Sequence, residues 1–214
     1  IKDENQRNMN ALQISIVKKN EKMFLYVFET IYCEIFDLKE FIYEVDDEGE
    51  SLFHKLVQYG LLPMIKTATE KLSREQLINY VSLKNHNGNN IIHMTAFNRD
   101  KNSIDFLFKI FNNHLNEELK SLLLLKSDKC TANTLLLSII RNNEIAFMYL
   151  FESVYCKRFK LQEFFKEVDN NNENLIFLIL RFGSITMMKS VLSLSKFPSH
   201  EIKKLLIIFN KNFA

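Results

Sequence analysis

Two histidines are the residues that most suggest chemistry in this sequence. His54 and His93 lie 39 residues apart in similar segments, 46–60 (DDEGESLFHKLVQYG) and 85–99 (NHNGNNIIHMTAFNR). A metal site needs several convergent ligands, and neither histidine has cysteine or histidine partners clustered with it. His86 lies seven residues before His93, across a predicted turn, and repetition of the segment explains that spacing better than catalysis. We therefore expect His54 and His93 to be structural.

The cysteines and acidic pairs are the remaining candidates for chemistry. Cys33, Cys130 and Cys156 cannot all pair within one chain, and they lack the spacing of a zinc site or a C-x-x-C redox motif. Acidic pairs such as Asp46 and Asp47 are expected to be solvated near helix starts. The chain also has no nucleophile elbow, phosphate loop, dinucleotide fingerprint or H-E-x-x-H motif. We therefore expect a protein without catalysis, and without a bound metal or cofactor.

Composition favours an all-α protein. The chain has 214 residues but only 4 Gly and 2 Pro, so few residues interrupt helices. The formal net charge is +2, so no general attraction to nucleic acid is expected. No apolar run approaches about 18 residues, and we predict no membrane span. The cysteines favour a reducing, intracellular and cytoplasmic location, with the nucleus as an alternative.

The elements that position these residues are repeated along the chain. Residues 20–46 (NEKMFLYVFETIYCEIFDLKEFIYEVD) align without a gap with residues 143–169 (NEIAFMYLFESVYCKRFKLQEFFKEVD), at an offset of 123 residues. The matched positions are mostly apolar or aromatic, as expected where two copies bury the same face. The segments around His54 and His93 divide this offset into units of 39, 44 and 40 residues. We predict one domain over 1–214, with units 1–44, 45–83, 84–127, 128–167 and 168–208 and a truncated sixth unit.

The turn that opens each unit resembles the ankyrin repeat, whose pattern is D-x-x-G-x-T-P-L-H-x-A-A-x-x-G. The second unit matches this pattern most fully and the third unit matches it in part. Later units depart from it, because Ala132 and Asn172 stand in the glycine place while Leu137 and Phe177 stand in the histidine place. The matching residues are Asp46, Gly49, Ser51, Phe53, His54 and Gly60 in the second unit, and Gly88, Ile92, His93 and Ala96 in the third.

This resemblance implies an ankyrin-like α-solenoid of about five helical pairs, in which Ser51 and Thr134 cap helices. The units exceed the roughly 33 residues of that family, so we predict an extra short helix in each. The predicted extra helices are 37–45, 73–82, 116–125, 160–168 and 199–208, with Asp37, Ser73, Asn116 and Ser199 as caps. A HEAT-type solenoid with helical pairs of about 40 residues is the alternative fold.

The same resemblance implies a protein-binding surface made of turn tips and the exposed ends of the first helices. The tip residues are Asp47, Glu48, His86, Asn87, Lys129, Asn170 and Asn171. The helix-end residues are Lys18, Lys19, Gln58, Tyr59, Asn98, Arg99, Arg141, Asn142, Arg181 and Phe182. The five cations among them form a basic stripe suited to an acidic protein segment, although cations also suit helix C-termini for structural reasons.

We therefore predict a non-catalytic scaffold that binds a partner protein. The alternatives are the cytosolic portion of a larger membrane channel or toxin, and an effector of a pathogen or symbiont. Nucleic-acid binding through the basic stripe is disfavoured by the near-neutral charge. The segment 205–214 (LLIIFNKNFA) is apolar, so self-association through this end is expected unless another part of the protein covers it.

Overall fold

The computed structural model describes residues 8–32, 44–129, 131–160, 168–169 and 171–194. These residues form helices joined by turns and loops. Within the described ranges there is no β-strand, and the only β-type pairing consists of two isolated bridges, Val45 with Ser51 and Val168 with Asn174. The all-α class predicted from composition is confirmed.

Short helices alternate with tight turns along the chain. Most are α-helical, but η1 and η3 are π-helices and η2 is a 3₁₀-helix. The helices are α1 (Ala11–Val17), α2 (Glu21–Tyr26), η1 (Val27–Tyr32), α4 (Leu52–Tyr59), α5 (Leu62–Glu70), α6 (Arg74–Ser82), α7 (Ile91–Met94), η2 (Thr95–Phe97), α8 (Lys101–Leu124), α9 (Thr134–Ile140), α10 (Glu144–Tyr149), η3 (Leu150–Tyr155), α11 (Cys156–Arg158), α13 (Leu175–Phe182) and α14 (Ile185–Leu194). No helix in the described ranges is long and apolar enough to cross a membrane.

Polar caps determine where the helices begin. The Ser51 side chain accepts from the backbone N–H of His54 at the start of α4, as predicted. Asn133, rather than the predicted Thr134, caps α9, because the Asn133 side chain accepts from the backbone N–H of Leu136 while Thr134 is already helical. Nearly every other described α-helix also starts after a capping Asn, Ser or Asp, which explains why so short a helix as α7 forms.

The internal duplication is visible in the helices themselves. Helices α9, α10, η3, α13 and α14 each begin 123 residues after α1, α2, η1, α4 and α5. Even the π-helix recurs, and the stacked ring pair Phe24–Phe28 matches the pair Phe147–Phe151, with 5.4 Å between ring centroids in both. The copies therefore share backbone geometry and core packing as well as sequence.

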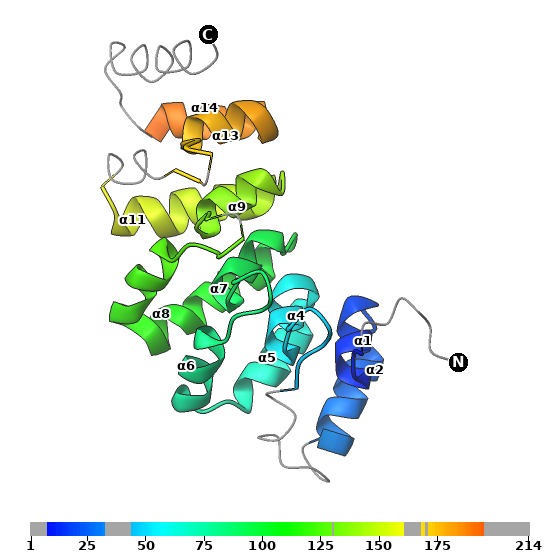
Figure 1. Cartoon of the computed structure of the whole chain (residues 1–214). Coiled ribbons are helices and arrows are strands. Elements are labelled where there is room, and N and C mark those ends of the chain that lie inside the picture. Colours follow the sequence, from blue (N-terminus) through cyan, green and yellow to red (C-terminus); the bar gives the residue numbers. More distant parts are fainter. Residues whose placement is uncertain (1–7, 33–43, 130, 161–167, 170, 195–214) are drawn as a thin grey trace.

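Two layers of helices follow the chain order (Figure 1). In one layer, α1 contacts α4, α4 contacts α7, α7 contacts α9, and α9 contacts α13. In the other layer, α2 contacts α5, α5 contacts α8, α8 contacts α10, and α10 contacts α14. Apolar side chains fill the space between the layers and exclude water from it. Each pair of helices therefore depends on its neighbours for burial.

The predicted extra helices are only partly correct. Helix α6, capped by Ser73, occupies the range predicted as 73–82. The range 116–125 does not form a separate helix, and Asn116 is not a cap, because α8 runs through it without a break. The apolar stripe of α8 continues through the buried Leu115, Leu119 and Leu123, and no Gly or Pro interrupts it. The other predicted extra helices, with Asp37 and Ser199, lie wholly or largely outside the described residues.

The turns adopt the left-handed conformation where the repeat pattern requires it. Gly49 and Gly88 have φ of +72° and +74°, and Asn172, which replaces Gly49 in the second copy, has φ of 59°. The turn before α9 departs from the prediction, since the residue with positive φ is Thr131 and not Ala132. That turn closes from Ser127 to Ala132 and so contains one more residue than the others.

Candidate protein-binding surface

Three of the repeat turns are stabilised by the side chain at their first residue. The Asp46 carboxylate accepts from the backbone N–H groups of Glu48 and Glu50. Asn85 accepts in the same way from Asn87 and Asn89, and Asp169 from Asn171 and Glu173. Side chains of this kind stabilise turns locally. The tips of these three turns are therefore preformed.

The tips of successive turns are joined by backbone hydrogen bonds. The N–H of His86 donates to the carbonyl of Glu48 at 2.9 Å, and the N–H of Lys129 donates to the carbonyl of Asn87 at 3.2 Å. The structure thus brings the predicted tip residues Asp47, Glu48, His86, Asn87 and Lys129 into one row, which we call the tip row.

The tip row is only partly exposed. Asp47, His86 and Lys129 are exposed, whereas Glu48 and Asn87 are partly buried. Asp47 accepts a hydrogen bond from the side chain of Asn8 at 2.6 Å. Asn171 is exposed at the last turn, while Asn170 lies outside the described residues. The row is mixed in charge and does not by itself select a partner.

The ends of the first helices form a second row of exposed residues, the helix-end row. It consists of Lys18, Lys19, Gln58, Tyr59, Arg99, Arg141, Asn142, Arg181 and Phe182, of which Gln58 is partly buried. The Arg141 guanidinium lies 4.8 Å from the ring centroid of Phe97. The Arg181 guanidinium lies 4.9 Å from the centroid of Phe182 and makes an ion pair with Glu173 at 2.5 Å. Aromatic rings therefore hold two of the predicted cations in place.

Asn98 does not belong to this exposed row, contrary to the prediction. It is buried, because its side chain donates to the carbonyl of Val57 at 2.8 Å and accepts from the N–H of Asp100 at 2.8 Å. The residue joins two units instead of facing a partner. A polar residue at the end of a helix is expected to be exposed, but here its side chain bonds to the backbone of the following loop and of the preceding unit.

The two histidines are structural, as predicted. His54 Nε2 donates to the carbonyl of Asn89 at 3.1 Å, and Nδ1 accepts from the N–H of Ser51 at 3.3 Å. His93 Nε2 donates in the same way to Leu125 at 2.8 Å. Burial lowers the pKa of both His54 and His93 to about 4, so both are neutral at pH 7. Each histidine links its own turn to the next unit.

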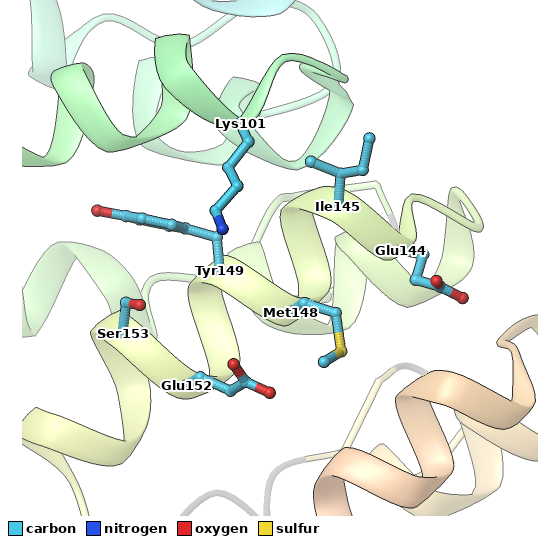
Figure 2. A pocket seen from close by; sticks show the side chains of 7 residues that line it. All are labelled: Lys101, Glu144, Ile145, Met148, Tyr149, Glu152 and Ser153. Atoms are coloured by element: carbon cyan, nitrogen blue, oxygen red, sulfur yellow. The ribbon is translucent and has the colours of Figure 1, made fainter.

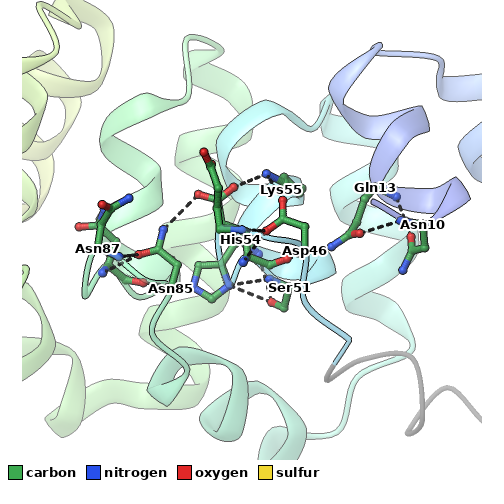
Figure 3. Close-up of polar contacts among 11 residues, drawn as sticks. Asn10, Gln13, Asp46, Ser51, His54, Lys55, Asn85 and Asn87 are labelled. Atoms are coloured by element: carbon green, nitrogen blue, oxygen red, sulfur yellow. Dashed lines mark hydrogen bonds and ion pairs between the residues drawn. The ribbon is translucent and has the colours of Figure 1, made fainter. Parts of the chain in front are cut away.

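A buried ionic cluster lies behind the turn 46–50 (Figure 3). Lys55 Nζ makes an ion pair with Asp46 at 2.8 Å and a closer one with Glu50, and all three residues are buried. Burial alone lowers the pKa of Lys55, but the hydrogen bonds to Asp46 and Glu50 outweigh it and raise that pKa. Asn85 from the next turn donates to Glu50 at 3.1 Å. Sequence reasoning missed this cluster, because a lysine within an amphipathic helix is usually solvated.

A hollow of about 340 Å³ lies on the other layer, between α8 and α10 (Figure 2). It is lined by Lys101, Glu144, Ile145, Met148, Tyr149, Glu152 and Ser153. Its two carboxylates are already engaged, Glu144 with Ser184 and Glu152 with Ser190. The hollow therefore holds no unengaged acid–base pair.

No group of metal-ligating side chains gathers within the described ranges. Cys156 is half-buried, and burial, with the nearby Glu152, raises the pKa of its thiol to about 11. The thiol is therefore protonated and a poor nucleophile at neutral pH. Cys33 and Cys130 lie outside the described residues. The described side chains offer surfaces for binding more readily than a reactive centre.

Comparisons with known proteins show similarity of fold only. No family model matches the chain, and no curated protein matches it. A solved structure, "Bd0816 Predatory Endopeptidase from Bdellovibrio bacteriovorus in complex with immunity protein Bd3460", matches with a TM-score of 0.53 and 14% identity. The match covers 86% of this chain and 81% of that chain. The expected membership of the ankyrin-repeat family is therefore wrong, because no family model supports it and the structural similarity leads instead to this immunity-protein complex.

Proposed function

We propose that this protein is a non-catalytic scaffold that binds an acidic segment of a partner protein through the helix-end row. The observation that carries this proposal is the placement of Arg141, which is exposed and stacked on Phe97. A guanidinium held in this way loses little conformational freedom on binding a carboxylate, and arginine and aromatic residues are frequent energetic centres of interfaces.

The electrostatics of the row support the same assignment. Lys18, Lys19, Arg99 and Arg141 are exposed, and no described acidic side chain forms an ion pair with them. The row follows the first layer of helices, which we propose to be a helical-pair solenoid. An extended acidic segment lying across that layer would meet successive cations. An intracellular location is part of this proposal.

Charge reversal on the row tests this function. Affinity capture from the source cells with the intact chain should recover a partner that the double variant Arg99→Glu/Arg141→Glu loses. The matched control is Lys66→Glu/Lys71→Glu, which also reverses two positive charges, at exposed lysines of the other layer. Binding of the recovered partner should weaken as salt increases. Equal capture by both double variants would exclude the helix-end row.

A second candidate function is inhibition of a peptidase. It rests on the similarity to a structure in which an immunity protein is bound to an endopeptidase. This function predicts that the recovered partner hydrolyses peptides and that the intact chain suppresses this activity. A captured peptidase whose activity is unchanged by the chain would contradict inhibition while leaving protein binding intact.

A further inference from the structure

The α2 end face, defined here as Asn20, Met23 and Tyr26, is exposed. Met23 is 50% exposed and Tyr26 is 62% exposed. Asn20 caps α2 through its side-chain oxygen, and no described residue accepts a hydrogen bond from its side-chain N–H₂. Among the described helices, α2 contacts α1, η1 and α5, while the three residues of this face are exposed.

The internal duplication identifies the residues that correspond to this face. Asn20, Met23 and Tyr26 match Asn143, Ala146 and Tyr149, each 123 residues later. In that copy Asn143 and Ala146 are buried, and Tyr149 is half-buried. The same face of the same helix is therefore covered in one copy and open in the other.

The covering element in the second copy consists of η2, the loop that follows it and the first turns of α8. The Asn143 side chain donates to the carbonyls of Ala96 at 3.0 Å and Asn98 at 2.7 Å. The Tyr149 hydroxyl donates to Asp105 at 3.0 Å, and the Tyr149 ring lies 5.8 Å from that of Phe108. The contact thus combines main-chain carbonyls, one carboxylate and one aromatic ring.

We propose that the α2 end face binds a partner protein that presents a loop and helix start with the chemistry of residues 96–108. The partner places two main-chain carbonyls at the Asn20 amide, and a carboxylate in the second turn of the following helix at the Tyr26 hydroxyl. An aromatic ring follows that carboxylate and packs on the Tyr26 ring. This face adjoins the helix-end row at Lys19 but shares no residue with it, and it would act whether or not that row binds an acidic segment.

Met23 is the position at which the open and covered faces differ most. The matching Ala146 is small and fully buried, which allows the covering element to approach closely. A methionine occupies part of that space and adapts its shape to the neighbouring surface. The natural partner therefore has a smaller residue or a hollow opposite Met23. A copy of residues 95–115 should bind the face, and should bind more tightly when Met23 is shortened.

The test uses the intact chain and a fluorescent peptide of residues 95–115 of this sequence, with binding followed by fluorescence anisotropy. We expect Met23→Ala to tighten binding about threefold or more, and Tyr26→Phe to weaken it about fivefold, the usual effect of one lost hydrogen bond. The peptide variant Asp105→Asn should cause the same loss, and combining the two changes should add little.

The matched control is Tyr149→Phe in the protein, which removes the equivalent hydroxyl from the covered face. It should leave peptide binding unchanged. Loss of binding in Tyr149→Phe but not in Tyr26→Phe would mean that the peptide displaces α8, and would overturn the proposal. Absence of binding by both the intact chain and Met23→Ala would also overturn it. So would a concentration-dependent dimer in sedimentation that Met23→Asp abolishes, because the occupant would then be a second copy.

Discussion

The turns that begin at Asp46 and Asp169 share the same backbone hydrogen bonds but neutralise their acidic residues in different ways. Both carry an acidic pair, Asp46 with Glu50 and Asp169 with Glu173. In the first turn a buried lysine bridges the pair. In the second turn Leu178 occupies the position of Lys55, and the 52% exposed Arg181 reaches Glu173 from the helix end.

This difference shows that the turn backbone does not require a particular counter-charge. The acid at the first position accepts backbone hydrogen bonds in both turns, and these bonds alone suffice to shape the turn. The basic partner instead decides how strongly the turn is attached to the helix behind it. A buried ion pair is costly to break on one side, whereas an exposed pair contributes little.

The largest expected effect comes from removing the buried lysine. Lys55→Met leaves Asp46 and Glu50 buried without a positive partner, and should lower the free energy of unfolding by about 3–5 kcal/mol. Urea denaturation measures this loss. Leu178→Met at the matching position is the control and should cost less than about 1.5 kcal/mol. Equal losses at the two positions would show that the lysine does not distinguish the turns.

The next largest effect is a pH dependence of stability that comes from His54 and His93. Later units have Phe177 and Leu137 at the equivalent positions and so do not contribute to it. The two histidines' folded pKa of about 4 lies below the ordinary 6.5, so between these values the unfolded chain binds protons that the folded chain excludes. Stability is therefore retained above pH 6.5 and falls as the pH drops towards 4. From pH 7 to 5.5 the loss should be about 1 kcal/mol per histidine.

Thermal unfolding at several pH values tests this dependence. Replacing both histidines by glutamine should lower stability at pH 7 and flatten the profile between pH 7 and 5.5. If stability still depends on pH after both replacements, the dependence comes from other groups.

A smaller effect is expected at the left-handed position of the two turns. Gly49→Ala should cost about 1–2 kcal/mol, because φ is +72° and the added Cβ would lie 2.7 Å from Cδ2 of His86. Asn172→Gly should change stability by less than about 0.5 kcal/mol, because asparagine already tolerates this conformation. Denaturant midpoints measure both. A cost for Asn172→Gly as large as that for Gly49→Ala would contradict this explanation.

The smallest effect is expected for Arg181→Gln. The ion pair with Glu173 is half-exposed and screened by salt, so the loss should stay below about 1 kcal/mol. It should shrink further in 0.5 M NaCl, whereas the Lys55→Met loss should persist there because its partners are buried. A large loss of stability that does not change with salt would contradict the proposed difference between the exposed ion pair of Arg181 and the buried ion pair of Lys55.

The sequence predicted what depends on local pattern. Helix content, the duplication, the Ser51 and Ser73 caps and the structural role of His54 follow from composition, spacing and capping chemistry. These features involve residues close together in the chain, or residues repeated at a constant offset.

The features that the sequence did not predict depend on contacts between units. Asn98 is buried because Val57 from the preceding unit accepts its hydrogen bond. Lys55 is buried because Asn85 and the next turn cover its carboxylate partners. The family resemblance was misleading for a related reason, since the turn motif describes a local shape that unrelated proteins can share.

Helix α8 affects how the molecule unfolds. It contacts α5, α6 and α7 on one side and α9 and α10 on the other, and its 24 residues span about 36 Å. Repeat proteins often unfold a few repeats at a time, because each repeat contacts only its neighbours. Here both copies pack against the single helix α8, so neither copy can unfold without disturbing α8. Amide protons of Ile104, Phe108 and Leu119 should therefore exchange with solvent only when the whole chain unfolds.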